Sequence, residues 1–343
     1  MIPIQNLYYL LCYAWNRLPA RGEWQQLNTA AFHRPLELLT RLLLTAARRR
    51  VQQGLALSYA EVEADLDEVR GRILLTPTVA RDLLRRGQVH CAYDELGPNT
   101  PVNRLVLGTF EVLSRTRHLS AGTRQEVRRL MARFPEAVTP LPLTRYYLRA
   151  ARRQRLPAAD GFLLNLCALI FRGALPDPST EGRTRFQDFR RDEPLMAQLF
   201  EQFVRNFYRL EQRRYRVLSE TIAWQAEAET EEARRLLPAM ITDTSLDSPA
   251  RKIILDTKYY NAALRPRYDQ QKLISPHLYQ LYAYLQNQPL RPGQQLEGIL
   301  LYPAATQAVD LRYTLGPHPV RVVTLDLMQP WDGIAADLLR LVA

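Results

Sequence analysis

The sequence predicts an α/β (α+β) protein made of two domains. Stretches with apolar residues at helical spacing alternate with shorter apolar runs that are typical of β-strands. Residues 173–185 are rich in proline and glycine and form the clearest interruption in the chain. The 343 residues are sufficient for a hydrophobic core on each side of it. We therefore expect a mixed α+β domain over residues 1–180, and a mixed sheet flanked by helices over residues 181–343.

The first predicted domain begins with a stretch dense in apolar and aromatic side chains, which we interpret as a buried helix. A second helix is rich in leucine and ends in basic residues, as suits a helix C-terminus. Shorter elements follow. The expected helices span residues 4–18, 35–53, 79–86, 102–114, 123–134 and 162–172, and the strands lie within residues 55–75 and 88–93.

The second predicted domain contains one strong helix, a group of strands, a second helix and further strands. This order is typical of an α/β nuclease core, in which helices flank a mixed sheet. The expected helices span residues 193–212, 275–285 and 333–342, and the strands span residues 215–222, 296–302, 309–313 and 320–324 beside a hairpin at residues 240–260.

The hairpin places two aspartates together. Its two apolar runs flank a polar centre that contains Pro249, and a turn between Pro249 and Ala250 suits the fixed φ of proline. In that register Asp243 lies opposite Asp256, with Cβ atoms about 5 Å apart. Asp247 would then face Lys252 as a favourable cross-strand pair.

Strand alternation adds an amine to the same face. Lys258 follows Asp256 by two residues and shares its face, whereas Thr257 points away. Two carboxylates without a partner repel each other, so such a pair either has a raised pKa or holds a cation. Mg²⁺ commonly takes one or two carboxylates with phosphate oxygens. An amine beside the ion can orient water. We predict metal-assisted phosphodiester hydrolysis, against the alternative of two exposed strand-end aspartates and a surface lysine.

The basic composition favours a polyanionic partner. The net charge is +11, and only three of the 46 basic residues are lysines, so Lys258 stands out as a compact ammonium in a chain that otherwise uses arginine. Arginines cluster at residues 145–155 and are interleaved with Tyr146 and Tyr147. This pattern fits a DNA-contacting surface, and it also fits an ordinary solvated helix face.

Several other classes of site and location are disfavoured. Cys12, Cys91 and Cys167 are far apart, without the C-x-x-C spacing of a zinc or iron–sulfur site. No apolar stretch reaches membrane-spanning length, and the first residues lack the features of a signal peptide. We expect a cytoplasmic protein without a membrane partner.

Two helices can add residues to the predicted site. Glu201 borders the apolar face of the helix at residues 193–212, where a carboxylate can reach a metal ion or remain solvated. Gln280 and Tyr284 are spaced i, i+4 on the helix at residues 275–285 and share a face. They can hold Lys258 or a DNA phosphate, or simply pack the helix.

These motifs resemble a known family. The pattern D-x12-D-x-K, ending in Lys258 and followed by Tyr259 and Tyr260, is similar to the PD-(D/E)xK nuclease core when taken with LFEQFV before it and YQLYAY after it. Together with the opening IPIQNLYYLLCYAW, and with GRI, NR and RFQDF, it resembles the McrC family, the nuclease subunits of 5-methylcytosine restriction systems. The resemblance covers essentially the whole chain.

The resemblance implies roles for individual residues. Asp243 and Asp256 would bind Mg²⁺, and Lys258 would help to activate water. Thr242 stands where the motif expects proline, the least chemical member of the pattern. Glu201 matches a helix carboxylate found in many related nucleases. Gln280 and Tyr284 resemble the Q-x3-Y helix of a subset of them.

The resemblance also implies partners. Residues 181–343 would be the endonuclease domain acting on double-stranded, methylated DNA, and residues 1–180 would dock on McrB, a GTP-hydrolysing AAA+ hexamer, and stimulate it. The chain has no Gly-Lys dipeptide and so no phosphate-binding loop of its own. Two alternatives stay open: a non-catalytic activator of the AAA+ motor, and a stand-alone DNA repair nuclease.

Overall fold

A computed structural model describes residues 2–17, 34–176, 184–227, 229–259, 264–267, 270–304 and 308–343. The chain forms two compact units. The sheet unit comprises Met1–Pro35 and Asp188–Ala343, and the helical unit comprises Leu36–Gln187. The expected boundary near residue 180 therefore lies close to the second crossing between the units, but residues 1–35 group with the C-terminal part of the chain.

The sheet unit is built on a six-stranded mixed sheet. Its strand order is β14-β15-β13-β10-β9-β6, in which β10, β13 and β15 are parallel and the other neighbours are antiparallel. Central strand β10 is buried along nearly its whole length, as expected of a strand covered on both faces. Two further pairs, β7-β8 and β11-β12, form separate two-stranded sheets. The strands of this unit are β6 (Arg216–Leu218), β7 (Thr221–Ile222), β8 (Met240–Ile241), β9 (Thr244–Asp247), β10 (Arg251–Thr257), β11 (Leu264–Arg267), β12 (Gln270–Leu273), β13 (Gln295–Pro303), β14 (Asp310–Leu315) and β15 (His318–Leu325).

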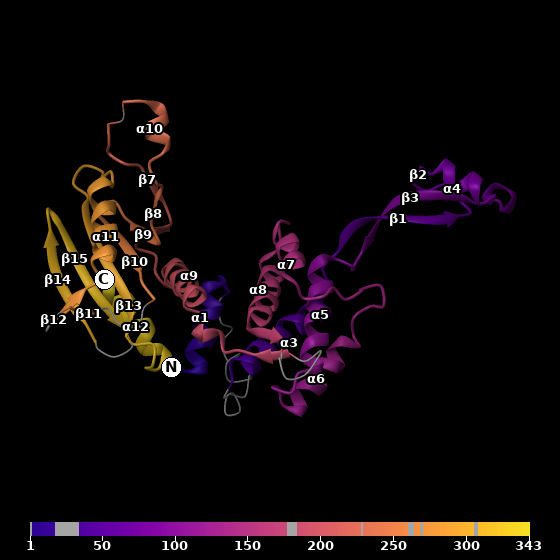
Figure 1. Cartoon of the computed structure of the whole chain (residues 1–343), viewed down its shortest axis with the longest axis horizontal. Coiled ribbons are helices and arrows are strands. Elements are labelled where there is room, and N and C mark those ends of the chain that lie inside the picture. The colour runs from indigo at the N-terminus through magenta and orange to yellow at the C-terminus, as the bar shows by residue number, and fades with distance from the viewer. Residues whose placement is uncertain are drawn as a thin grey trace. The chain divides into compact units, whose positions relative to one another are not determined.

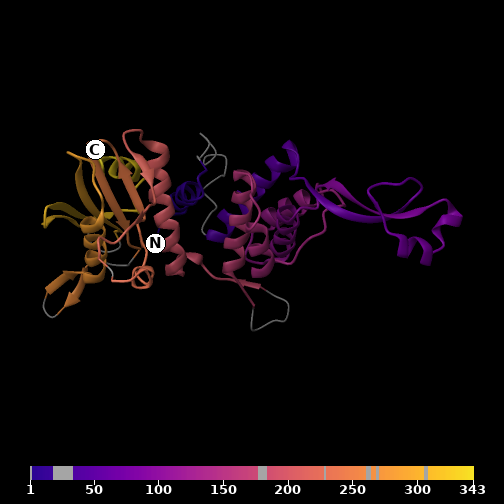
Figure 2. The same cartoon turned by 90° about the horizontal axis from the view of Figure 1, so that it is seen from above.

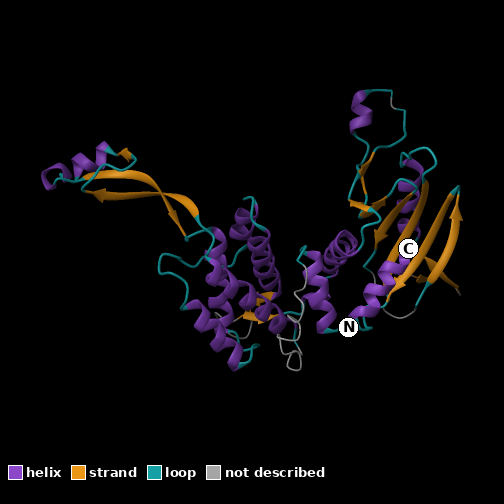
Figure 3. Cartoon of the chain, turned by 180° about the vertical axis from the view of Figure 1, so that it is seen from behind, coloured by secondary structure: helices purple, strands orange, loops and turns teal. Residues whose placement is uncertain are grey.

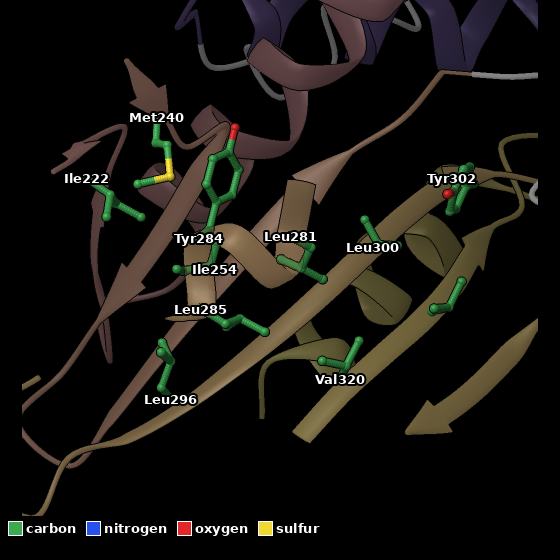
Figure 4. Close-up of a cluster of buried hydrophobic side chains, with 11 residues drawn as sticks. Ile222, Met240, Ile254, Leu281, Tyr284, Leu285, Leu296, Leu300, Tyr302 and Val320 are labelled. Atoms are coloured by element: carbon green, nitrogen blue, oxygen red, sulfur yellow. The ribbon is translucent and has the colours of Figure 1, made fainter. Parts of the chain in front are cut away.

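Helices cover both faces of this sheet (Figure 3). Leu281, Tyr284 and Leu285 of α11 pack on alternate residues of the central strands, among them Ile254 and Leu300, in one buried cluster (Figure 4). The intervening residues of β10 face the side on which α9 packs. The helices of this unit are α1 (Ile4–Ala14), η3 (Phe189–Arg191), α9 (Glu193–Glu211), α10 (Glu231–Arg235), α11 (Ser275–Asn287) and α12 (Trp331–Leu341).

The N-terminal helix α1 belongs to the sheet unit because it packs on α9. Tyr13 lies against Phe203 and Phe207 of α9, and Tyr9 stacks on Trp331 with ring centroids 4.4 Å apart. The buried amide of Asn206 donates to the carbonyls of Tyr13 and Ala14 at the end of α1, at 3.0 and 3.1 Å. These contacts explain why the first residues leave the domain that sequence order predicts for them.

The helical unit consists of a helical body and an arm. The arm is an antiparallel ribbon of β1 and β3, with β2 and α4 near its far end, that extends from the helices of the same unit (Figures 1 and 2). We call residues 58–97 the arm and the rest of the unit the helical body. The elements are α3 (Pro35–Gln53), β1 (Ser58–Leu66), β2 (Arg72–Ile73), α4 (Leu75–Ala80), η2 (Leu83–Arg86), β3 (Val89–Gly97), α5 (Pro101–Arg115), α6 (Ala121–Met131), α7 (Arg145–Arg152), α8 (Ala158–Gly173), β4 (Ala174–Pro176) and β5 (Thr184–Phe186).

Most predicted elements are present, and there are three differences. The helix expected over residues 79–86 is wrong, because Asp82 adopts a left-handed conformation (φ 51°) that separates α4 from η2. The arginine-rich segment forms α7, a helix that was not among those expected from the sequence. The interruption at residues 173–185 begins and ends in the short paired strands β4 and β5, while residues 177–183 lie outside the described part.

Within the described residues, no helix combines the length and the apolar character needed to cross a membrane.

Candidate active site

The predicted hairpin forms with the predicted register. Strands β9 and β10 pair antiparallel, with Asp247 opposite Lys252 and Thr244 opposite Leu255. Ser248 accepts from and donates to Arg251 across the two-residue turn of Pro249 and Ala250. Continuing this alignment by one step places Asp243 opposite Asp256, at the C-terminal end of β10.

One expected consequence of that register is wrong. Lys252 is buried and pairs with Glu220, with Nζ 2.8 Å from Oε1, rather than with Asp247. Asp247 pairs instead with Arg291 and accepts from Gln294 at 2.8 Å. Each charge finds a partner on a neighbouring segment of the chain, and a hairpin considered alone does not contain those segments.

Asp243 is held by the backbone and side chain of Thr257. Its Oδ2 accepts from the Thr257 amide at 2.8 Å and from the Thr257 hydroxyl at 2.7 Å. Thr257, expected to point away from the face that carries Asp256 and Lys258, therefore holds Asp243 in place. The strand pairing ends at Thr244, so Asp243 lies beyond the last paired residue and its side chain turns toward Thr257.

Asp256 is a buried acid close to a second acid. The residue is 0% exposed, and Oδ1 has no hydrogen-bond partner. Burial, followed by the nearby charge of Asp243, raises the pKa of Asp256 to about 7, and Lys258 opposes this rise. A carboxylate in this environment gains more from a bound cation than a solvated one does.

Lys258 belongs to a short chain of polar contacts that runs from Asp256 to Tyr284. Its Nζ is 2.7 Å from Oδ2 of Asp256 and donates to Oε1 of Gln280 at 2.9 Å. The amide of Gln280 donates to the Tyr284 hydroxyl at 2.6 Å, and that hydroxyl donates to the Ile241 carbonyl at 2.9 Å. The i, i+4 pair on α11 thus fixes the ammonium beside the acid, and the Tyr284 ring anchors the pair in the cluster of Figure 4.

Glu201 lies near the site but has a partner on its own helix. Arg205 donates to Glu201 at 3.0 Å and to the backbone carbonyl of Asp243 at 2.8 Å. Burial and the charge of Asp243 raise the pKa of Glu201, while Arg205 lowers it. Arg205 therefore ties α9 to the bend that carries Asp243.

The donor set is small. In the part of the chain that the structure describes, no three His, Cys, Asp or Glu side chains converge as metal ligands. Asp243 and Asp256 remain as an acidic pair, with Lys258 beside them. Asp243 and Lys258 are partly exposed, so solvent reaches the site at the end of β10.

Sequence reasoning missed two residues of this site. Thr257 occupies the unspecified position x between Asp256 and Lys258, Arg205 lies outside the D-x12-D-x-K pattern, and both act by holding Asp243. A signal existed for Arg205, since its i, i+4 spacing from Glu201 predicts a helical ion pair. Tyr260 of the quoted motif lies outside the described residues, while Tyr259 packs edge-to-face on Phe200.

A mixed sheet flanked by helices, with two acids and a lysine at the end of a central hairpin, defines a restriction-endonuclease-like core. Residues 5–303 match the model of the family described as McrBC 5-methylcytosine restriction system component, and the chain belongs to this family. The expected resemblance is therefore confirmed.

Two known proteins are similar over nearly the whole chain. A protein of Escherichia coli (strain K12), Type IV methyl-directed restriction enzyme EcoKMcrBC, is 30% identical over 341 residues, which are 99% of this chain and 97% of that protein. A solved structure from Thermococcus gammatolerans, a half-complex from a tetradecameric assembly of McrB AAA+ hexamers with bound McrC, matches with a TM-score of 0.58 at 15% identity. That match covers 99% of this chain and 76% of the other, and it shows a shared fold.

Proposed function

We propose that this chain is the Mg²⁺-dependent DNA endonuclease subunit of a modification-dependent, 5-methylcytosine-directed restriction system in the cytoplasm. The observation that carries the proposal is the buried Asp256, with its raised pKa, between Asp243 and Lys258. The E. coli relative is a methyl-directed restriction enzyme by name, which supports the choice of substrate.

The residues present fit a Mg²⁺ ion. Oδ1 of Asp256 is buried without a hydrogen-bond partner, and the nearby charge of Asp243 disfavours its ionised form. Mg²⁺ commonly takes one or two protein carboxylates and completes its shell with water and phosphate oxygens, so a third protein ligand is not required. Asp243 and Asp256 would hold the ion, which when bound would polarise a phosphodiester and lower the pKa of water.

The chain's own residues position the reacting groups. Thr257 orients Asp243, and Gln280 orients Lys258. The Lys258 ammonium can hold the attacking water or neutralise charge that develops on the phosphate. Glu201, paired with Arg205, acts in this proposal by keeping Arg205 on the Asp243 carbonyl, and it is available as a further acid near the site.

We assign the helical unit to docking on a GTP-hydrolysing, McrB-like AAA+ hexamer. Support comes from the Thermococcus structure, which contains McrB AAA+ hexamers with bound McrC. The arm also exposes large apolar side chains near its far end, among them Leu75 (70% exposed), Val79 (67%) and Leu84 (63%). Exposed apolar side chains gathered on one projection are typical of a protein-binding surface.

The test is cleavage of methylated and unmethylated plasmid by the chain, with and without the AAA+ partner, Mg²⁺ and GTP. We expect cleavage of methylated DNA only when all components are present. Asp256→Asn and Asp243→Asn should abolish it, whereas Glu232→Gln, which removes an exposed acid in the same unit, should cleave normally.

The variants also separate the alternatives. An Asp256→Asn protein that still restricts DNA would replace the nuclease proposal with that of a non-catalytic activator. Efficient cleavage by the purified chain without partner or GTP would instead indicate a stand-alone nuclease.

A further inference from the structure

The positive charge of this chain is concentrated in one part of it. The sheet unit carries 22 basic and 20 acidic residues, a net charge of +2. The arm carries 5 basic and 8 acidic residues, whereas the helical body carries 19 basic and 7 acidic residues, a net charge of +12. The helical body alone thus exceeds the net charge of +11 of the whole chain.

Helix α7 presents much of this charge to solvent. Leu148 and Ala151 face the helical body, and exposed arginines occupy the outer side of the helix and the residues after it. We call these residues the arginine surface: Arg145, Arg149, Arg152, Arg153 and Arg155.

The arginine surface has no acidic partners in the part of the chain that the structure describes. In the described ranges, none of its five arginines forms an ion pair, and Arg152 donates only to the Asn165 amide oxygen, at 3.0 Å. The nearest acid along the chain, Asp160, is buried and pairs with Arg50 at 2.9 Å. Burial, followed by the like charge of Arg172 on α8, lowers the pKa of Arg152.

The geometry matches a phosphate backbone. Arg145, Arg149 and Arg152 follow one another at about one helical turn, roughly 5.4 Å along the axis. Guanidinium groups bind phosphate oxygens through two parallel hydrogen bonds. Tyr146, 74% exposed beside them, adds a phenol that can donate to a phosphate or sugar oxygen.

We infer that the arginine surface of α7 is a second DNA-binding site, which holds the phosphate backbone of duplex DNA without reading its sequence. A nearly neutral sheet unit offers little counterion release, so the affinity of the chain for DNA must come mainly from the helical body. The inference rests on the proposed function only in taking DNA as the substrate.

The test is fluorescence anisotropy of the full chain with an unmethylated duplex of about 30 base pairs in EDTA, over salt concentrations from about 0.05 to 0.3 M. For Arg149→Gln/Arg153→Gln we expect the slope of log K against log salt to shrink by about 1.8, and affinity at 0.1 M salt to fall at least about 10-fold. Arg85→Gln/Arg86→Gln, which removes the same charge from exposed positions on the arm, should bind as the unaltered chain does.

A conservative variant guards against misfolding. Arg149→Lys/Arg153→Lys keeps both charges, so it should restore most of the salt slope if the glutamine variant lost phosphate contacts. Equal DNA affinity of the two glutamine variants would overturn the inference, as would no duplex binding by the unaltered chain. Loss of binding to the AAA+ partner with unchanged DNA affinity would overturn it too, and would assign the surface to the protein partner. Because EDTA prevents metal-dependent cleavage, these outcomes are independent of whether the nuclease proposal holds.

Discussion

The candidate active site and the arginine surface use charge in opposite ways. At the end of β10, each charged group has a partner or a holder: Lys258 contacts Asp256 and Gln280, and Arg205 contacts Glu201. On α7 and the residues directly after it, five exposed arginines form no ion pair with an acid among the described residues. Paired charges fix side chains in position, which chemistry requires, whereas unpaired charges leave an attraction for a partner. The sheet unit is therefore built for positioning, and the helical body for binding a polyanion.

The largest expected effect is at Lys258. Lys258→Ala should lower cleavage by a factor of about 100 to 1000, because one positioned charge at an active site contributes about 2.7–4 kcal/mol to catalysis. Lys258→Arg should rescue little of this, since a planar guanidinium does not fit between Asp256 and Gln280 as a compact ammonium does. Single-turnover cleavage with the AAA+ partner measures both variants.

Lys272→Ala is the matched control, because it removes an exposed lysine from the same unit. If Lys258→Arg cleaved as well as the unaltered chain, the charge alone would be sufficient and the positioning described here would be wrong.

A smaller effect is expected on folding stability, where a glycine-to-alanine substitution in each unit compares how tightly the two units are packed. A Cβ at Gly108 of α5 would lie 1.9 Å from the Leu141 carbonyl oxygen, a backbone atom with little freedom to move. A Cβ at Gly298 of β13 would lie 3.0 Å from the tips of Leu281 and Leu285, which can shift. Gly108→Ala should therefore cost about 3 kcal/mol and Gly298→Ala about 1 kcal/mol in urea unfolding.

The helix propensity of alanine offsets at most about 1 kcal/mol at Gly108. Equal losses at the two glycines would show that the loop carrying Leu141 yields as easily as the two leucine side chains.

A further expected effect is the pH dependence of stability at Asp256, which does not involve catalysis. Its pKa is about 7 in the folded protein and near 3.8 when unfolded, so unfolding releases a proton between these values. The metal-free protein therefore loses stability as pH rises through this window and levels off above it. Asp256→Asn lacks this loss, so its free energy of unfolding, followed by thermal melting across pH, should exceed that of the unaltered protein most above pH 7.

Asp310→Asn provides a control of opposite sign. The Arg321 guanidinium lowers the pKa of Asp310, so this substitution should reduce stability at neutral pH. A gain for Asp256→Asn that did not shrink toward acidic pH would contradict the buried-acid explanation, and would point to packing instead.

Much of the site follows from local sequence rules. The hairpin register depends on a two-residue turn and on strand alternation, so Asp243, Asp256 and Lys258 could be brought together from the sequence. The i, i+4 spacing on α11 likewise predicts that Gln280 and Tyr284 share a face. Thr257 could not be assigned in this way, because its contact with Asp243 arises only where the strand pairing ends.

The sequence by itself determined the order of elements, the hairpin and the excess of arginine, because periodicity, turn residues and charge act over short distances along the chain. Only the tertiary structure decided which distant groups meet. It packed α1 on α9, paired Lys252 with Glu220, and left the arginines of α7 without acidic partners among the described residues. Such pairings depend on long-range packing, in which the buried area and hydrogen bonds of whole elements outweigh any preference between neighbouring residues.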